Sequence, residues 1–412
     1  MMNIVGVIVE YNPFHNGHAY HLKKAREETG ADLVIAVMSG NFLQRGEPAL
    51  LSKWARAEMA LKGGVDIVFE LPYQFAVQKA ETFAKGAVEI LYKAGCNSIC
   101  FGSESGSTAN FHATLRYIKK HNQLFQQQIK HHIEKGVSYP KAMSLAFQDL
   151  PFDEEIVDLS KPNNILGFQY MKAIDDHGFD MKVYTIKRKN ADYHDEHFSS
   201  QTIASATSIR KALFSEKNEM AQIKQYVPDH TFQLLTQYKN EFGQLHSWEN
   251  YWPYLRYKLL QTNQEELKAI YEVEEGLENR LISYALYADS FKDFMKKIKT
   301  KRYTWTRLQR TCVHILTNAK KSDMKQPKAS YLRLLGMTEK GRHYLNKFKH
   351  QSDIPIVSKL SPFYNNQIEL DIRSSRVYSL GAGLAFQTKL LQTEFHHPPI
   401  YLSQKQTDSF PN

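Results

Sequence analysis

"VEYNPFHNGHAYHL" spans residues 9–22 and follows directly on the apolar run Ile4–Val9. A short run of apolar, mostly β-branched residues predicts a buried strand. The spacing of apolar residues over Gly17–Thr29 predicts a helix, and Gly30 is a common C-cap. A strand that gives way directly to a helix is the start of a βαβ unit. This stretch therefore indicates an α/β fold.

The same alternation continues outward from this stretch. We expect further strands at Leu33–Met38, Val65–Leu71 and Ser98–Phe101, with helices at Ser52–Lys62 and Gln78–Ala94 between them. Ser52 is a good N-cap for the first of these helices. Strands that alternate with helices predict a Rossmann-like parallel sheet with right-handed crossovers.

The rest of the chain divides into three parts. Residues 108–150 are polar and helical in pattern, which indicates a helical insertion, and a helix, a strand and a further helix start follow up to about residue 213. From about residue 217 the periodicity is mainly helical. Residues 352–360 are typical of one isolated strand. We therefore expect a catalytic domain over 1–215 and a mainly helical domain over 216–412.

Composition limits the classes of function. The chain has 412 residues and a formal net charge of +10, which favours a polyanionic partner such as nucleic acid. The three cysteines, Cys96, Cys100 and Cys312, give no disulfide framework and are expected to be buried thiols. There is no signal peptide and no apolar run of membrane-spanning length, so we expect a cytoplasmic protein.

His15, Gly17 and His18 lie where a parallel sheet of this kind binds its ligands, beyond the carboxyl end of the first strand. A helix N-terminus favours phosphate, and glycine lets backbone approach a ligand closely. Both imidazoles can donate hydrogen bonds to phosphate oxygens, which suits attack on the α-phosphate of a nucleoside triphosphate. The alternatives are ordinary surface histidines or a zinc pair, for which Glu10 is the candidate third ligand.

"HNGH" together with "ASATSIR" (204–210) resembles the HxGH nucleotidyltransferase-like superfamily, in which the second motif contacts the triphosphate. The matching residues are Ser205, Thr207, Ser208 and Arg210. Longer blocks are similar to the tRNA(Met) cytidine acetate ligase family (TmcAL). They include "MSGNFLQRGEPALLSKWARAEMAL", "GVDIVFELP", "FGSES", "PNNILGFQY" and "RYTWTRLQR".

The resemblance implies a two-step reaction. Acetate and ATP would first give acetyl-adenylate and pyrophosphate, and the acetyl group would then pass to the exocyclic amine of the wobble cytidine of elongator tRNA(Met), releasing AMP. An unpaired anticodon base leaves that amine accessible. ATP and acetate are thus the expected small substrates and His15 and His18 the expected catalytic residues. Oligomeric state does not follow from the sequence.

The ATP site implied by the resemblance extends along the first strand and helix. It comprises Val7, Ile8, Val9, Glu10, Tyr11, Asn12, Pro13, Phe14, His15, Asn16, Gly17, His18, Ala19, Tyr20 and His21, with Gly102, Asn163, Asn164, Arg188, Ser205, Thr207 and Arg210. Other roles stay open for four of these. Gly102 could be a plain strand-end glycine, Asn163 and Asn164 helix caps, and Arg188 a solvated strand terminus.

"SGNFLQRGEPA" (39–49) follows the second strand, where active-site loops usually lie. Ser39, Gly40, Gln44, Arg45 and Glu47 are candidates for the acetate or cytidine end of the site, and an arginine suits a small carboxylate. A simple surface loop is the alternative.

For tRNA, the candidates are basic residues, several of them interleaved with Tyr303 and Trp305: Lys53, Arg56, Lys299, Lys301, Arg302, Arg307, Arg310, Lys320 and Lys321. Lys53 and Arg56 could contact either tRNA or the phosphates of ATP. Basic side chains contact phosphates and aromatic rings stack on unpaired bases. The alternative is a solvated helix face over buried aromatics.

Mg²⁺ is expected from ATP chemistry, although no acidic cluster marks its site. The chain also has no literal K-M-S-K-S loop. Two rival functions remain. One is a small-molecule adenylyltransferase that makes a nucleotide cofactor, and the other is a tRNA-binding protein without catalysis.

Overall fold

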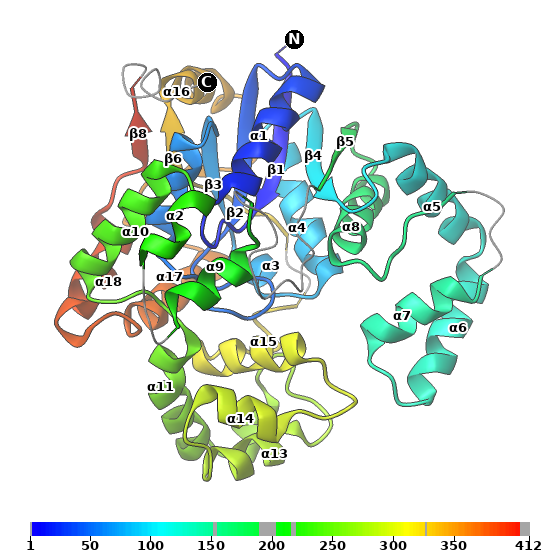
Figure 1. Ribbon diagram of the computed structural model, residues 1–412, viewed down its shortest axis with the longest axis vertical. Helices are drawn as coiled ribbons and strands as arrows, with labels where there is room; N and C mark the ends of the chain where they lie inside the picture. The colour runs from blue at the N-terminus through cyan, green and yellow to red at the C-terminus, as the bar shows by residue number, and fades with distance from the viewer. Residues whose placement is uncertain (1, 151–154, 189–202, 216–219, 326–327, 404–412) are drawn as a thin grey trace.

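Figure 1 presents the computed structural model, which describes residues 2–150, 155–188, 203–215, 220–325 and 328–403. A mostly parallel sheet runs through the molecule with helices on both faces. The strand order is β5-β4-β1-β2-β3-β6-β7, and β8 pairs with β6. The strands are β1 (Ile4–Val9), β2 (Leu33–Ser39), β3 (Ile67–Leu71), β4 (Ser98–Ser103), β5 (Lys182–Lys187), β6 (Leu332–Thr338), β7 (Ile356–Val357) and β8 (Ile400–Leu402).

Strands β1 to β4 lie where the apolar runs predict them. β1 pairs in parallel with β2, with Ile4 opposite Leu33 and Val9 opposite Met38. Every residue of β2 is buried. A central parallel strand is covered on both faces, so its side chains are apolar on both, and the sequence shows a continuous run rather than alternation.

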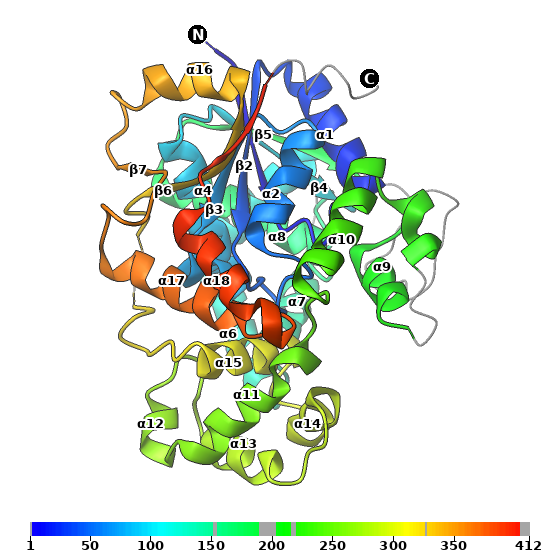
Figure 2. The same cartoon turned by 90° about the vertical axis from the view of Figure 1, so that its left-hand side faces the viewer.

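Two apolar cores cover the two faces of the sheet (Figure 2). On one face lie α1 (Asn16–Thr29), α2 (Lys53–Lys62), α9 (Ala206–Leu213) and α10 (Asp229–Phe242), and on the other lie α4 (Ala80–Lys93) and α8 (Pro162–His177). The predicted helix ends are confirmed. Gly30 ends α1 in the left-handed conformation, at φ 59°, and the Ser52 side chain accepts a hydrogen bond from the Ala55 N–H at the start of α2.

The other helices form two groups outside these layers. The insertion consists of α5 (Thr108–Lys120), α6 (Asn122–Glu134) and α7 (Tyr139–Gln148), which project to one side (Figure 1). Beyond the carboxyl ends of the central strands lie α11 (Trp248–Gln261), α12 (Gln264–Lys268), α13 (Leu277–Ala285), α14 (Phe291–Ile298) and α15 (Trp305–Leu316). Shorter or later elements are α3 (Tyr73–Ala76), η1 (Met220–Tyr226), α16 (Glu339–Phe348), α17 (Asn366–Ser379), η2 (Leu384–Phe386) and α18 (Gln387–His396).

The second half of the chain returns to the sheet, which corrects the expectation of one isolated strand at 352–360. β6 pairs antiparallel with β3, with Ile67 opposite Met337, and β7 and β8 then pair with β6. The sheet therefore contains strands from both sides of the predicted domain boundary at residue 215. Sequence periodicity is local, whereas the pairing of β6 with β3 joins segments about 270 residues apart. No pattern within either segment therefore predicts this pairing.

A buried ion-pair cluster joins the two halves of the chain. The Lys53 Nζ lies 2.7 Å from Glu70 Oε2 and 2.8 Å from Glu394 Oε1, and its side chain has no exposed surface. The prediction that Lys53 contacts tRNA is therefore wrong. Charged side chains are almost never fully buried unless they are paired, and the partners of Lys53 lie on other elements, 17 and 341 residues away.

Candidate active site

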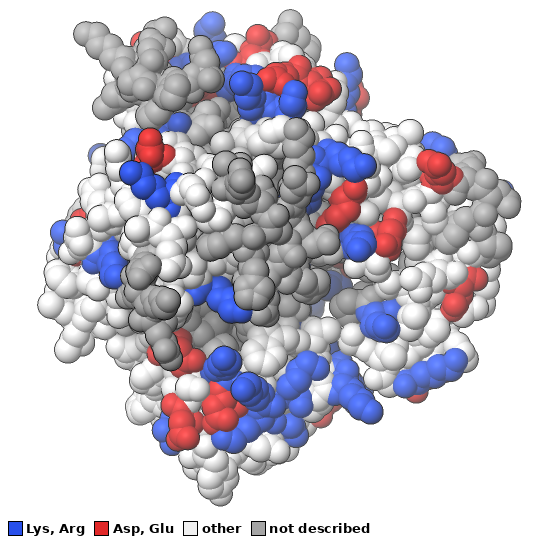
Figure 3. All heavy atoms as spheres, viewed as in Figure 1, with Lys and Arg blue, Asp and Glu red and all other residues white. Residues whose placement is uncertain are grey.

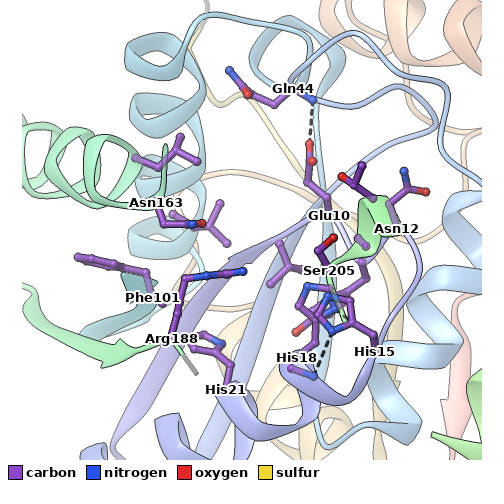
Figure 4. A pocket seen from close by; sticks show the side chains of 18 of the residues that line it. Glu10, Asn12, His15, His18, His21, Gln44, Phe101, Asn163, Arg188 and Ser205 are labelled. Atoms are coloured by element: carbon purple, nitrogen blue, oxygen red, sulfur yellow. Dashed lines mark hydrogen bonds between the residues drawn. The ribbon is translucent and has the colours of Figure 1, made fainter. Parts of the chain in front are cut away.

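A cavity of about 280 Å³ opens where the strand order reverses, with β4 and β5 on one side of β1 and β2 and β3 on the other. Open parallel sheets bind ligands at such a point, beyond the carboxyl ends of the strands. Figure 4 views this cavity from close by. The ends of β1, β4 and β5, the loop after β2, the start of α8 and the start of α9 line it.

His15 and His18 form a stacked pair at the entrance to α1. Their ring centroids are 3.7 Å apart, with 27° between the planes. His15 Nδ1 accepts a hydrogen bond from the Gly17 N–H at 3.0 Å, and His18 Nδ1 accepts one from the His15 N–H at 3.3 Å. A neutral imidazole that accepts at Nδ1 carries its proton at Nε2. This network therefore assigns an Nε2–H donor to each ring.

The structure gives a steric reason why residue 17 is glycine, which the sequence alone does not reveal. A Cβ at this position would come within 2.8 Å of the His15 ring. The missing side chain thus makes room for the His15 imidazole as well as for any ligand.

Burial keeps the imidazole rings of His15, His18 and His21 neutral. It lowers the pKa of His15 from 6.5 to about 3, with smaller contributions from the positive charges of Arg188 and Arg210. The pKa of His18 falls well below 6.5 for the same first reason, and that of His21 falls to about 4. Neutral rings with fixed tautomers are hydrogen-bond donors, not cations, in the free protein.

We therefore predict that none of these three imidazoles titrates near its ordinary value of 6.5. Because each pKa is lowered, the ring takes up a proton only as the pH falls well below that value. The Cε1–H resonances, assigned with single His→Gln variants, are expected to stay constant from about pH 7.5 to about pH 5. A midpoint near pH 6.5 for His15 or His18 would contradict this geometry.

The start of α9 faces the same cavity. The Ser205 side chain accepts from the Ser208 N–H at 3.0 Å and caps the helix, while Ser205, Thr207 and Arg210 all line the cavity. Arg210 donates to the Asn12 carbonyl oxygen at 2.9 Å and to Glu47 Oε2 at 2.8 Å. The two sequence motifs, about 190 residues apart, thus meet at one site, at the N-terminal ends of α1 and α9.

Of the predicted segment from Val7 to His21, most residues line the cavity: Ile8, Val9, Glu10, Tyr11, Asn12, His15, Gly17, His18, Tyr20 and His21. The others, Val7, Pro13, Phe14, Asn16 and Ala19, are not part of its lining. Val7 and Phe14 are fully buried in the core, and Asn16 Nδ2 donates to the Gln225 carbonyl oxygen. Gly102 and Arg188 line the opposite wall, at the ends of β4 and β5.

Asn163 lines the cavity, but Asn164 does not. The Asn164 Oδ1 accepts from the N–H groups of Glu104 and Ser105, so its side chain is occupied within the fold. Neither asparagine caps α8 with its side chain. Glu104 takes that part instead, since its carboxylate accepts from the N–H groups of Asn163 and Asn164. No local pattern points to Glu104, because its partners lie 59 and 60 residues away.

The loop after β2 supplies one wall, through Leu43, Gln44, Arg45 and Glu47. Two of its predicted ligand contacts are wrong. Ser39 has no exposed surface, and its hydroxyl lies 3.4 Å from Glu10 Oε1. Gly40 is also buried, and a Cβ there would come within 2.5 Å of Glu70. Both residues support the cavity wall from behind.

Sequence reasoning missed the apolar wall of the cavity. Leu43, Phe83, Phe101, Leu166, Tyr170 and Ile186 contribute to it. Most lie in helices and strands whose apolar residues are indistinguishable from core in the sequence.

Arg56 has a structural task in place of the predicted tRNA contact. It is fully buried and donates to the carbonyl oxygens of Glu10 at 2.6 Å and Ser39 at 3.1 Å. It therefore ties the carboxyl end of β1 to that of β2.

The predicted tRNA contact of Arg310 is also wrong, because its charged group is not at the surface. Its side chain is 9% exposed and pairs with Glu272 at 2.7 Å. Lys299, Lys301, Lys320 and Lys321 are exposed, and Arg302 and Arg307 reach the surface beside Glu275 and Glu274. Figure 3 shows Lys and Arg side chains gathered over α14 and α15 on the face that Figure 1 presents.

Helices α15 and α11 pack against the loop after β2. The Gly46 backbone packs against the backbone of Arg310 on α15, where a Cβ would come within 2.3 Å, and Gly46 has φ 77°. The Trp248 indole N–H donates to the Gly46 carbonyl oxygen at 2.8 Å.

Within the described ranges, no three His, Cys, Asp or Glu side chains gather as metal ligands would. The three cysteines are free and buried, as predicted. Among the helices that the structure describes, none combines the length and the apolar character needed to cross a membrane.

Comparisons with known proteins agree on one family. Residues 2–393 match the family HIGH Nucleotidyl Transferase. The chain is 48% identical over 405 residues to the tRNA(Met) cytidine acetate ligase of Bacillus subtilis (strain 168), covering 97% of each chain. It is similar to an apo crystal structure of Thermotoga maritima TmcAL, with a TM-score of 0.90, 34% identity and coverage of 98% of this chain and 100% of that one. A structure of the same Thermotoga protein bound with alpha-thio ATP has a TM-score of 0.88, 33% identity and the same coverage.

Proposed function

The chain belongs to the tRNA(Met) cytidine acetate ligase family, and from this membership we propose that it joins acetate to a cytidine of elongator tRNA(Met) at the expense of ATP. The observation that carries the proposal is the meeting of two motifs at one cavity. His15 and His18 present Nε2–H donors there, and the capped start of α9 lies opposite.

The first step is the activation of acetate. A carboxylate is a poor acyl donor, so acetate would attack the α-phosphate of ATP, forming acetyl-adenylate and releasing pyrophosphate. Negative charge grows on the phosphoryl oxygens in the transition state, and fixed neutral donors stabilise it there. His15 and His18 would hold the α-phosphate. Ser205, Thr207 and the N–H groups that start α9 would hold the rest of the triphosphate.

The second step is transfer of the acetyl group to the exocyclic N4 of the wobble cytidine, with release of AMP. Arg45 and Gln44, on the opposite wall, lie at the end of the cavity that we assign to acetate and cytidine. Arg45 could pair with the acetate carboxylate before activation. The apolar side chains of Phe83 and Leu166 would contact its methyl group.

Mg²⁺ would enter with the nucleotide. The described residues offer no cluster of metal ligands, and Mg²⁺ is commonly held mainly by phosphates and water in such sites. No step above depends on a protein ligand for it. A tRNA substrate also agrees with the cytoplasmic location predicted from the sequence.

The test is one incubation of protein, ATP, labelled acetate and tRNA transcripts. We expect label in elongator tRNA(Met) only when ATP is present. Consumption of ATP with a mononucleotide instead of acetate would support a small-molecule adenylyltransferase. ATP binding without turnover of any acid would support a tRNA-binding protein without catalysis.

The basic face over α14 and α15 would bind tRNA. We predict that the double variant Arg302→Ala/Arg307→Ala still forms acetyl-adenylate but binds tRNA more weakly. The slope of log affinity against log salt should fall by about 2, because each phosphate contact releases counterions. Filter binding over a KCl series measures this. Arg376→Ala is the control, since Arg376 is also exposed and near an acidic partner, Glu369, but lies on α17. An unchanged slope in the double variant would mean that tRNA binds to another part of the surface.

A further inference from the structure

Glu10 directly follows β1 and lines the cavity. Its backbone carbonyl is held by Arg56, and its Oε1 accepts from the Gln44 N–H at 2.8 Å and from the Ser39 hydroxyl at 3.4 Å. In the described part of the chain, its Oε2 has no hydrogen-bond partner. Figure 4 shows the Glu10 carboxylate between the histidine pair and the loop that carries Gln44. One oxygen is thus fixed and the other is available to a ligand.

The second step needs a base. The exocyclic amine of cytosine is a weak nucleophile because its lone pair is conjugated with the ring. When N4 bonds to the acetyl carbon it must lose a proton, and a positioned base in the cavity lowers the barrier to that loss.

The other titratable groups of the cavity are poor candidates for this task. His15 and His18 already accept hydrogen bonds at Nδ1 and carry protons at Nε2, and their lowered pKa values make them weak bases. Glu47 is paired with Arg210. Burial raises the pKa of Tyr11 and Tyr170, so both stay protonated.

The surroundings of Glu10 suit a base. Burial raises its pKa, and the charge of Glu47 raises it further, while the Gln44 N–H, Arg45 and Arg56 oppose this. A carboxylate with a raised pKa takes up a proton more readily than an exposed one. Further titratable groups line the cavity: Tyr11, Tyr20, His21, Tyr170, Lys187 and Arg188. Burial lowers the pKa of His21 to about 4, so this imidazole is a weak base as well.

We propose that Glu10 is the general base of acetyl transfer and receives the proton that leaves N4 of the target cytidine. The inference deepens the proposed function and rests on it. The bond between N4 and the acetyl carbon forms. The bond between that carbon and the phosphate oxygen of AMP breaks, AMP leaves with the electron pair, and the proton passes from N4 to Oε2 of Glu10 and later to solvent.

The test separates transfer from activation by supplying synthetic acetyl-adenylate. Single-turnover acetylation of elongator tRNA(Met) transcript is followed over a pH series for the wild type and for Glu10→Gln. We expect the wild-type rate to rise with pH as Glu10 loses its proton. In Glu10→Gln that rise should be absent and transfer about 10²–10⁴-fold slower. Formation of acetyl-adenylate from ATP and acetate should fall far less, by about tenfold at most.

Two further variants complete the design. Glu10→Asp keeps a carboxylate and should recover part of the rate and the rise with pH. Glu58→Gln is the control, because Glu58 pairs with Lys62 on α2 and does not line the cavity. Transfer by Glu10→Gln within about threefold of wild type, or equal loss of both steps, would overturn the proposal. Wild-type protein that fails to acetylate tRNA from added acetyl-adenylate would instead overturn the proposed function.

Discussion

Replacing His18 with alanine is expected to slow acetyl-adenylate formation by about a hundredfold to a thousandfold, while the affinity for tRNA changes little. The variant removes one neutral Nε2–H donor and the acceptor of the His15 N–H. Loss of a single donor to developing oxyanion charge typically has this size. Acetate-dependent exchange of labelled pyrophosphate into ATP measures the first step, and filter binding measures tRNA affinity.

His343→Ala is a suitable control. His343 is also on a helix, α16, but it is exposed and does not line the cavity. It should exchange pyrophosphate at the wild-type rate. A His18→Ala variant that activates acetate within about threefold of wild type would mean that the stacked pair does not stabilise the transition state. Equal loss of tRNA binding would contradict the division of tasks between the cavity and the helical face.

Replacing Lys53 with alanine is expected to lower the free energy of unfolding by about 3–5 kcal/mol. The change leaves Glu70 and Glu394 buried and without their cation, and an unpaired buried charge is costly. Because the cluster joins α2, β3 and α18, the loss should loosen the attachment of the C-terminal segment to the sheet. Urea unfolding, followed by far-UV circular dichroism, measures it.

Lys62→Ala provides the matched comparison on the same helix. Lys62 pairs with Glu58 at 2.7 Å, but both side chains are partly exposed. Such pairs contribute about 0–1 kcal/mol. If Lys53→Ala and Lys62→Ala shifted the urea midpoint equally, the buried cluster would not stabilise the fold as argued.

Local features of the fold were predictable from the sequence. The end of α1 at Gly30, the start of α2 at Ser52 and the buried strand β2 follow from residues within a few positions of one another. The pairing of β6 with β3 depends on residues about 270 positions apart, so its prediction required the tertiary structure.

The candidate site likewise has features that the sequence predicts and features that only the tertiary structure reveals. The approach of His15 to His18 follows from their spacing at a helix start, and the structure adds the stacking and the tautomers. Basic residues were the main source of error. A charged residue normally lies at the surface, yet Lys53 and Arg310 are paired inside the fold with acidic residues of other elements, 17 and 341 residues from Lys53 and 38 residues from Arg310. Their burial depends on partners that no local pattern identifies.

The central claim is that the imidazoles of His15 and His18 donate hydrogen bonds to the α-phosphate of ATP. The most direct measurement is a crystal structure of this protein with a non-hydrolysable ATP analogue. We predict that Nε2 of His15 and Nε2 of His18 lie within hydrogen-bond distance of α-phosphate oxygens, with the outer phosphates at the start of α9. An analogue bound elsewhere, or bound with both rings out of contact with any phosphate oxygen, would contradict this account.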